Sequence, residues 1–193
     1  MTSSIKVADT QYPIHELLRN RWSARSFSDQ SISSYDMNRL LEAASWSFSA
    51  NNMQPWRYVY AHRHSPRFDD IWNCLAGGNR PWAKNAAALV ICLAQTNRNT
   101  EKPNVWASHD LGAANMNLIL QALSMDIYAH VMGGFDASKA LALSQANRDE
   151  WEVVAMLALG YLDAPDQLEE PFRTRELTPR TRKSIADFAW ELS

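Results

Sequence analysis

Apolar residues recur along this chain at two spacings, which predict two kinds of secondary structure. Short segments rich in aliphatic, β-branched and aromatic residues predict strands at 57–62, 87–94, 127–134 and 151–162. The segment 87–94 (AALVICLA) is apolar at every position, so we expect it to form a strand that is buried on both faces.

Apolar residues three and four positions apart predict helices between these strands. Ser33 and Asp36 precede such a run and predict a capped helix that continues through Ala44. Further helices are predicted at 13–18, 65–78, 108–125 and 137–145. We expect Ser65 to cap the second of these helices and Asp136 to cap the last.

The predicted helix 108–125 carries apolar residues on overlapping faces, among them Leu111, Ala114 and Leu118. Such a helix lies either at the centre of a core or in a subunit interface, and the sequence leaves both open. Helices and strands alternate throughout, which predicts one sheet flanked by helices, of the α/β or α+β class. After the last strand, the segment of about 163–193 changes to charged residues and proline, as is typical of a tail that lies on another subunit.

The composition fits one globular domain. Hydrophobic residues make up 46% of the chain, so a core can form without disulfides. Cys74 and Cys92 match no metal-ligand spacing, and we expect two reduced thiols and no metal site. The chain shows no signal peptide and no apolar run of the ~20 residues that span a membrane. We therefore expect a cytoplasmic protein without a membrane partner, and the net charge of −2 gives no general attraction for nucleic acid.

The segment RWSAR places two guanidinium groups and a hydroxyl close together after a predicted helix. Arg21, Ser23 and Arg25 are donors that suit phosphate oxygens, although a solvated turn is the alternative interpretation. The tail carries a second basic run, PRTRK, in which Arg180 and Arg182 are two residues apart. A run of this kind is usually a solvated face.

Two further segments carry amides or glycines beside predicted strands. Asn51, Asn52 and Gln54 offer amides that pair with the donors and acceptors along the edge of a heterocycle. The alternative is a helix exit stabilised by side-chain-to-backbone hydrogen bonds. Gly133 and Gly134 end a predicted strand and permit a ligand to approach the main chain, but an ordinary turn also explains them.

In their order along the chain, the segments RWSAR, SANNMQPWR, MGGFD, AMLALGY and PRTRK resemble the nitroreductase family of FMN-dependent oxidoreductases, over about residues 14–190. The resemblance implies an α+β, nitroreductase-like fold with a central, mainly antiparallel mixed sheet flanked by helices. It also implies an intertwined homodimer with two FMN sites, each built from both chains. The single domain 1–193 would then extend its tail, about 163–193, to the partner subunit.

The resemblance assigns roles to the basic residues. Arg21 and Ser23 would hold the FMN phosphate. Arg180 and Arg182 would join them from the tail. Arg25 would lie near the pyrimidine end of the flavin, where a cation favours the anionic reduced ring.

It also assigns roles to the polar loop and to the glycine segment. Asn52 would hydrogen-bond the flavin, and Gln54 would face the ribityl chain or the ring edge. The segment 131–134 would lie against one face of the ring and leave the other face open. The cofactor-binding residues that the resemblance implies are Arg21, Trp22, Ser23, Ala24, Arg25, Asn52, Gln54, Val131, Met132, Gly133, Gly134, Arg180 and Arg182.

The function that the resemblance implies is oxidation of NADH or NADPH and reduction of nitroaromatic, quinone or related electron-poor acceptors, by a ping-pong mechanism. No catalytic side chain is implied, because the chemistry takes place at flavin N5. Histidines such as His109 and His130 are interpreted as structural or surface residues. Many relatives have proline at the position of Phe48 and some have glutamate at that of Gly133, so substrate preference does not transfer.

Other functions stay open at this point. One alternative is a flavin-binding redox sensor without turnover. Another is a relative of the family that fragments flavin or removes halogens from its substrate. Nucleic-acid binding through the arginine-rich segments conflicts with the balanced charge. The polar loop 95–110 is expected to cover the active site, with Trp106 facing substrate or packed in a core or interface.

Overall fold

The computed structural model describes residues 5–97 and 103–192. Its strands are β1 (Trp56–His62), β2 (Ala88–Gln95), β3 (Ile127–Met132) and β4 (Trp151–Tyr161). Its helices are α2 (Glu16–Asn20), α3 (Ser34–Ser45), α4 (Phe68–Trp72), α5 (Arg80–Ala83), α6 (Ala107–Leu123), α7 (Ala137–Ser144) and α8 (Phe172–Leu177). The 3-10 turns are η1 (Ala50–Asn52), η2 (Pro165–Gln167) and η3 (Ile185–Asp187).

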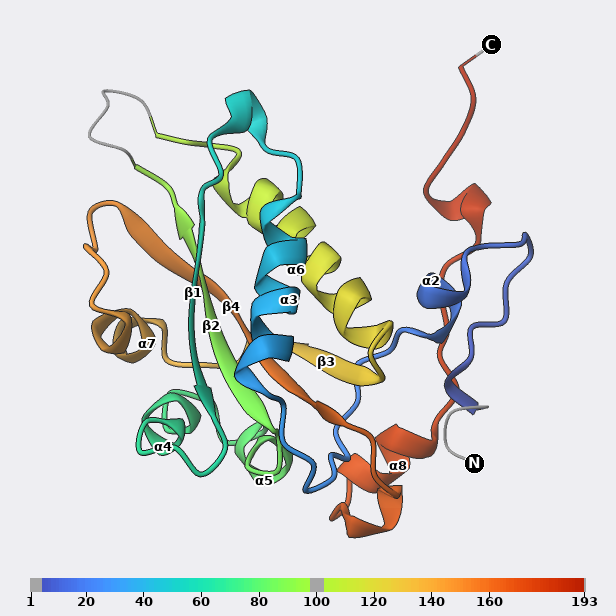
Figure 1. Ribbon diagram of the computed structural model, residues 1–193. Helices are drawn as coiled ribbons and strands as arrows, with labels where there is room; N and C mark the ends of the chain where they lie inside the picture. Colours follow the sequence, from blue (N-terminus) through green and yellow to red (C-terminus); the bar gives the residue numbers. More distant parts are fainter. Residues whose placement is uncertain (1–4, 98–102, 193) are drawn as a thin grey trace.

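The four strands form one sheet in the order β1-β2-β4-β3 (Figure 1). All three pairings are antiparallel, so β4 runs opposite to both of its neighbours. The predicted α+β class with a mainly antiparallel sheet is confirmed. The described strands contain no parallel pair, because β4 separates β2 from β3 and β2 separates β1 from β4, and the two members of each of these pairs run in the same direction.

The sheet is buried on both faces. In β2, Leu89, Ile91 and Leu93 lie in one apolar core, and Val90 and Cys92 lie in the other, as predicted for an all-apolar strand. Helices α3 and α6 cover the second core, and α4, α5 and α7 cover the first. The apolar faces of α6 therefore lie in the core of this chain, although several of its side chains stay partly exposed.

Two predicted helix starts are confirmed by their caps. The Ser33 hydroxyl accepts a hydrogen bond from Asp36 N at 3.0 Å, at the start of α3. Asp136 Oδ1 accepts from Lys139 N at 3.0 Å, at the start of α7. Each cap satisfies a helical N–H that has no partner within the helix.

The prediction of one helix over 65–78 is wrong, because the structure contains only the short helix α4 and, after a turn, α5. Ser65 makes no capping hydrogen bond. Instead the chain after α4 pairs with the glycine segment: Ala76 N donates to Gly134 O at 3.0 Å, and Leu75 bridges Phe135. The same contacts end β3 at Met132, two residues before the predicted end.

The segment 21–28 runs extended beside the ends of β3 and β4. Ser28 N donates to Tyr161 O at 2.9 Å, and Phe27 bridges Leu162. The ring of Phe27 lies directly over Gly160, where a Cβ would meet Phe27 Cδ1 at 2.7 Å. A side chain at this position of β4 would therefore displace the segment that carries the arginines.

We predict that Gly160→Ala lowers the free energy of unfolding by about 1–3 kcal/mol, the usual range for overpacking a core. The added methyl group forces Phe27 away from β4. Gly77→Ala is the control, because a Cβ there meets nothing within 4 Å. Urea unfolding measures both variants, and equal stability of the two would contradict the close packing of Phe27 on Gly160.

Candidate cofactor site

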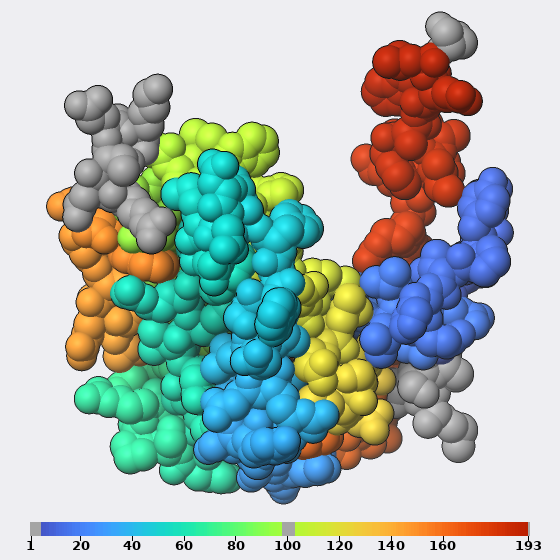
Figure 2. Space-filling model, turned by 45° about the horizontal axis from the view of Figure 1, so that its top comes forward, coloured from blue at the N-terminus to red at the C-terminus, as the bar shows by residue number. Residues whose placement is uncertain are grey.

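The residues that the sequence assigns to a cofactor site form two groups within one chain. The first, which we call the basic pocket, consists of Arg21, Arg180, Arg182 and Lys183 with the N-terminal segment opposite them. The second, which we call the amide loop, is residues 48–54. Figures 1 and 2 show η1 of the amide loop at one end of the sheet, and α2 and the tail on another side of the molecule.

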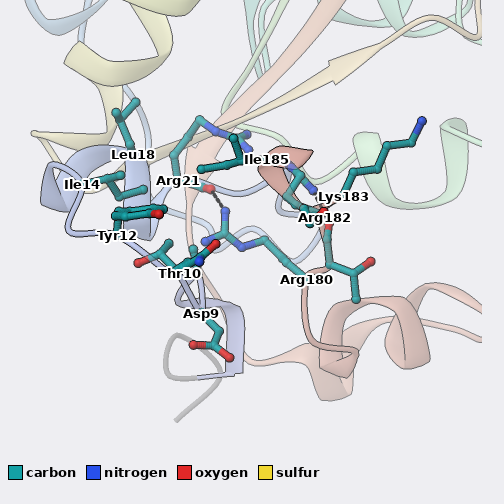
Figure 3. A pocket seen from close by; sticks show the side chains of 14 residues that line it. Asp9, Thr10, Tyr12, Ile14, Leu18, Arg21, Arg180, Arg182, Lys183 and Ile185 are labelled. Carbon is teal, nitrogen blue, oxygen red and sulfur yellow. Dashed lines mark hydrogen bonds between the residues drawn. The ribbon is translucent and has the colours of Figure 1, made fainter. Parts of the chain in front are cut away.

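The basic pocket is a cavity of about 500 Å³ between the N-terminal segment and the tail (Figure 3). Tyr12, Ile14 and Leu18 form its apolar wall. Arg21 and Arg180 enter it from two segments that are far apart in the sequence. The structure thus brings Arg21 of the first basic segment together with Arg180 and Arg182 of the tail, whereas Ser23 and Arg25 do not line this cavity.

Within the described part of the chain, Asp9 is the one acidic residue that lines the basic pocket, against Arg21, Arg180, Arg182 and Lys183. No carboxylate there forms an ion pair with Arg21, Arg180 or Arg182. Burial, followed by the charge of Arg182, lowers the pKa of Arg21. Burial, followed by the charges of Arg21 and Arg182, lowers the pKa of Arg180. Such a cluster of like charges favours the binding of an anion.

Arg180 joins the tail to the first basic segment. Its guanidinium donates hydrogen bonds to the carbonyls of Arg21 and Arg19. Its Nε is buried and has no hydrogen-bond partner in residues 5–97 and 103–192. Arg182, in contrast, is exposed and donates only to the neighbouring carbonyl of Thr181, at 2.7 Å.

The extended segment 21–25 alternates between the core and the surface. The side chains of Trp22 and Ala24 are buried in the core, so only their main chain can contact a ligand. Arg21, Ser23 and Arg25 point to the other side, where they are half-buried. The alternation turns three of the five residues of this segment towards the same side.

Arg25 and His130 connect this segment to the sheet. The Arg25 guanidinium lies 5.9 Å from the centre of the Trp82 ring and 3.9 Å from a carboxylate oxygen of Glu176. His130 Nδ1 donates to Ala24 O at 2.9 Å, and its ring stacks on Trp82 at 4.4 Å. Burial, followed by the charge of Arg25, lowers the pKa of His130 to about 4, so the imidazole is neutral at pH 7. His130 thus has a structural role.

The glycine segment at the end of β3 is held in place by the turn between α4 and α5. Gly134 O accepts from Asn79 Nδ2 at 3.0 Å, and a Cβ on Gly134 would crowd that amide at 3.1 Å. Gly133 has open space where a Cβ would lie. Val131 is exposed, whereas Met132 is buried in the core and presents only its main chain.

The amide loop adopts an unusual backbone conformation. Asn51, Asn52 and Gln54 have φ angles of 51°, 53° and 49°, in the left-handed region that residues other than glycine seldom adopt. Ser49 Oγ accepts from Gln54 N at 3.0 Å, and Gln54 Nε2 donates to Asn52 Oδ1 at 3.0 Å. Three such residues in one loop carry backbone strain, which these hydrogen bonds help to offset.

Asp110, which the sequence interpretation missed, holds the amide loop against α6. Its carboxylate is buried, with Oδ2 accepting from Ala50 N at 3.0 Å and Oδ1 lying 3.0 Å from His109 Nδ1. The signal in the sequence was the single acidic residue of the predicted helix 108–125. His109 contacts Phe48 at 5.7 Å and Trp106 at 5.8 Å between ring centres.

Trp106 is 56% exposed and therefore not a core residue of this chain. It directly precedes α6, at the end of the loop that was expected to cover the site; residues 98–102 of that loop lie outside the described residues. Cys74 and Cys92 are buried, free thiols. In the described part of the chain, no helix has the length and apolar character to cross a membrane, and His, Cys, Asp and Glu form no metal-binding group of three.

Comparison with known proteins gives the class of this fold. The model of the nitroreductase family matches residues 18–79 and 72–161. The chain therefore belongs to the nitroreductase family of oxidoreductases. An uncharacterized 15.4 kDa protein of Mycolicibacterium smegmatis is 31% identical over 126 residues, which are 63% of this chain and 83% of that protein.

Solved structures extend the likeness. The crystal structure of an oxidoreductase containing FMN superimposes with a TM-score of 0.90, at 34% identity over 95% of this chain and 93% of that chain. A nitroreductase of Desulfovibrio desulfuricans, solved in complex with FMN, gives a TM-score of 0.76 at 21% identity over 95% of this chain and 99% of that chain. The second likeness shows the fold alone.

We predict that His130 makes the stability of the protein depend on pH between about 4 and 6.5. The pKa of His130 is lowered in the folded state, so the unfolded state binds more protons in this window. Stability from this residue is complete above pH 6.5 and is lost as the pH falls to about 4. The shift corresponds to roughly 3 kcal/mol.

The measurement is the difference in unfolding free energy between the wild type and His130→Gln, at pH 4 and pH 7. The raised pKa of Glu176, caused mainly by burial, acts in the opposite direction in both proteins and cancels in the difference. A difference that stays constant across the pH range would contradict the buried, neutral state of His130.

Proposed function

We propose that this chain is an FMN-dependent oxidoreductase that takes a hydride from NADH or NADPH and reduces nitroaromatic, quinone or related electron-poor acceptors. The observation that carries the proposal is the basic pocket, where Arg21, Arg180 and Arg182 gather without an ion-paired carboxylate in the described chain. The dianionic phosphate of FMN supplies the missing charge. Membership of the nitroreductase family, and 34% identity with an oxidoreductase containing FMN, support this choice of anion.

The residues of the pocket fit a phosphate monoester. The buried Nε of Arg180, which lacks a partner in the described residues, is a donor for one of its oxygens. Arg21 and Arg182 provide further donors in the pocket, and Ser23, which does not line it, lies on the same side of the extended segment as Arg21. The open space at Gly133 would let a flat ring approach the main chain of the glycine segment, with Val131 beside it.

The second half of the site comes, in this proposal, from a partner subunit. The amide loop lies away from the basic pocket of its own chain, so Asn52 and Gln54 would contact the flavin held by another copy (Figure 2). The exposed tail supports a homodimer, because Phe188, Trp190 and Leu192 are apolar residues without cover in their own chain. The tail of about 163–193 was expected to reach the partner as a whole, but Glu176 and Arg180 are hydrogen-bonded to segments of their own chain. We therefore assign only the end of the tail, about 185–192, to a contact with the partner.

Bound FMN would supply the redox chemistry, accepting a hydride from the nicotinamide and then delivering it to the acceptor in a ping-pong sequence. The protein binds and orients the ring, and we assign no side chain to proton transfer. Arg25, half-buried beside Trp82, would stabilise negative charge at the pyrimidine end of the ring. Trp22 and Ala24 would act through the main chain that they fix in the core.

Anaerobic reduction tests this function. We expect the purified protein to be yellow, with about one FMN per chain as a symmetric dimer with two sites requires. NADH or NADPH should bleach it, and a nitroaromatic or a quinone should restore the colour. A flavin that neither nicotinamide reduces would favour a redox sensor. Loss of the flavin spectrum during turnover, or release of halide from a halogenated acceptor, would favour a fragmenting or dehalogenating enzyme.

A complementation experiment tests whether two chains build each site. Arg21→Ala removes a phosphate contact, and Asn52→Gly removes an amide while keeping the left-handed backbone free of strain. We expect each variant alone to retain little FMN. Refolded together, the two variants form mixed dimers in which one of the two sites has both native residues. Random pairing makes about half of the dimers mixed, so mixing should recover about a quarter of the FMN that the wild type binds.

Arg67→Ala is the matched control for Arg21→Ala, because Arg67 is exposed and pairs only with the nearby Asp70. It should keep its FMN. No recovery of FMN in mixtures whose dimers are shown to exchange would mean that each chain builds its own site. Equal FMN retention by Arg21→Ala and Arg67→Ala would show that the phosphate lies elsewhere.

A further inference from the structure

A buried carboxylate on the tail holds the segment that carries the arginines. Glu176, on α8, is 1% exposed. Its Oε1 accepts hydrogen bonds from Arg25 N at 3.0 Å and from Ser26 N at 3.2 Å. These N–H groups are thus paired with a side chain about 150 residues away rather than with a strand. Glu176 itself does not line the basic pocket.

A buried ammonium also holds the C-terminal end of α8. Lys6 is 5% exposed, and its Nζ donates to Arg175 O at 2.8 Å and to Thr178 O. These carbonyls lie at the C-terminal end of the helix, where main-chain carbonyls have no N–H partner within the helix. The Lys6 ammonium also lies 5.0 Å from the centre of the Trp22 ring. It therefore ties the N-terminal segment, α8 and the first basic segment together.

Arg180 adds a further contact between the tail and the N-terminal part of the chain, besides those of Glu176 and Lys6. Arg180 follows Thr178 by two residues and donates to the carbonyls of Arg19 and Arg21. The first basic segment and the tail are therefore linked at three places: through Glu176, through Lys6 and through Arg180 itself. Three links between two segments fix their relative position more firmly than one flexible arginine could.

Because both groups are buried and charged, we expect these links to fix the position of the two segments more than to raise the free energy of unfolding. Burial raises the pKa of Glu176 and lowers the pKa of Lys6, which means that both groups lose hydration in the folded protein. Buried charges of this kind add little net stability compared with apolar residues of the same size. Their hydrogen bonds nevertheless have fixed directions, and both groups use them on the main chain of the pocket-forming segments.

We propose that Glu176 and Lys6 are positioning residues, which hold the extended segment and the tail so that Arg21 and Arg180 face one another before a phosphate binds. The proposal rests on the proposed function, because it takes the phosphate of FMN as the ligand of the basic pocket. It goes further in naming two residues outside the pocket that act only through the placement of the arginines. Removing either should weaken the binding of the phosphate and leave the binding of the neutral, oxidised ring almost unchanged, because the role proposed for Arg25, which Glu176 contacts, concerns negative charge on the reduced ring.

Riboflavin, which has the ring and ribityl chain of FMN but no phosphate, separates the two effects. Dissociation constants of FMN and riboflavin are measured by flavin fluorescence for the apoprotein of each variant. In Glu176→Leu we expect FMN affinity to fall about tenfold or more, as for loss of two hydrogen bonds to a charged group. Riboflavin affinity should change by less than about threefold. Glu169→Leu, an exposed glutamate in the same part of the tail, should leave both values unchanged.

Two further variants distinguish positioning from folding. Glu176→Gln keeps an oxygen that can accept both N–H groups, and it should stay within about threefold of the wild type for both ligands. A loss as large as in Glu176→Leu would contradict the positioning role. Lys6→Met keeps the buried stem of the side chain and removes the two donated hydrogen bonds. It should show the same selective loss of FMN binding, and it provides the test if Glu176→Leu does not fold.

The outcomes separate this proposal from the function on which it rests. If the wild-type protein binds FMN no more tightly than riboflavin, the basic pocket is not a phosphate site, and the proposal about FMN binding fails with it. If the wild type prefers FMN but the Glu176 and Lys6 variants weaken both ligands equally, the two residues only support the fold. FMN affinity that is unaffected in both variants would also overturn the positioning role.

Discussion

The main chain of the extended segment 21–28 is hydrogen-bonded to several separate parts of the molecule, and the rest of the candidate site depends on this. Its partners include His130 of β3, the end of β4, Glu176 of α8 and Arg180 of the tail. Because successive side chains of an extended chain point in opposite directions, fixing the main chain decides where each side chain lies. Trp22 and Ala24 enter the core, and the basic and hydroxyl side chains stay together on the other side.

The same constraint explains how like charges can share one pocket. Guanidinium groups repel one another, and burial makes the repulsion stronger because less water screens it. Here Arg180 donates to two main-chain carbonyls, so part of the cost of bringing it beside Arg21 is offset by hydrogen bonds that need no counter-charge. Of the described residues that line the pocket, Asp9 is the one carboxylate, and it forms no ion pair with these arginines, so the remaining positive charge leaves the pocket ready for an anion.

Local patterns in the sequence predicted the parts of the fold that depend on local physics. The uninterrupted apolar run predicted the buried strand β2, and Ser33 and Asp136 predicted the starts of α3 and α7, because residues close in the sequence determine both features. The helix over 65–78 failed because Ala76 pairs with the glycine segment, more than 50 residues away. Glu176 could not be identified from the sequence for the same reason, since a glutamate in a charged tail is normally exposed.

Each half of the site keeps its shape within its own chain. The left-handed residues of the amide loop are unfavourable alone, but hydrogen bonds to Asp110 and Ser49 offset this cost without help from a second subunit. The basic pocket is likewise held by Lys6, Glu176 and Arg180. In the proposed dimer, a cofactor that spans both halves would therefore bind prepared surfaces rather than order disordered ones. Cofactor binding and dimer formation would stabilise one another because only the dimer offers the ligand both sets of contacts.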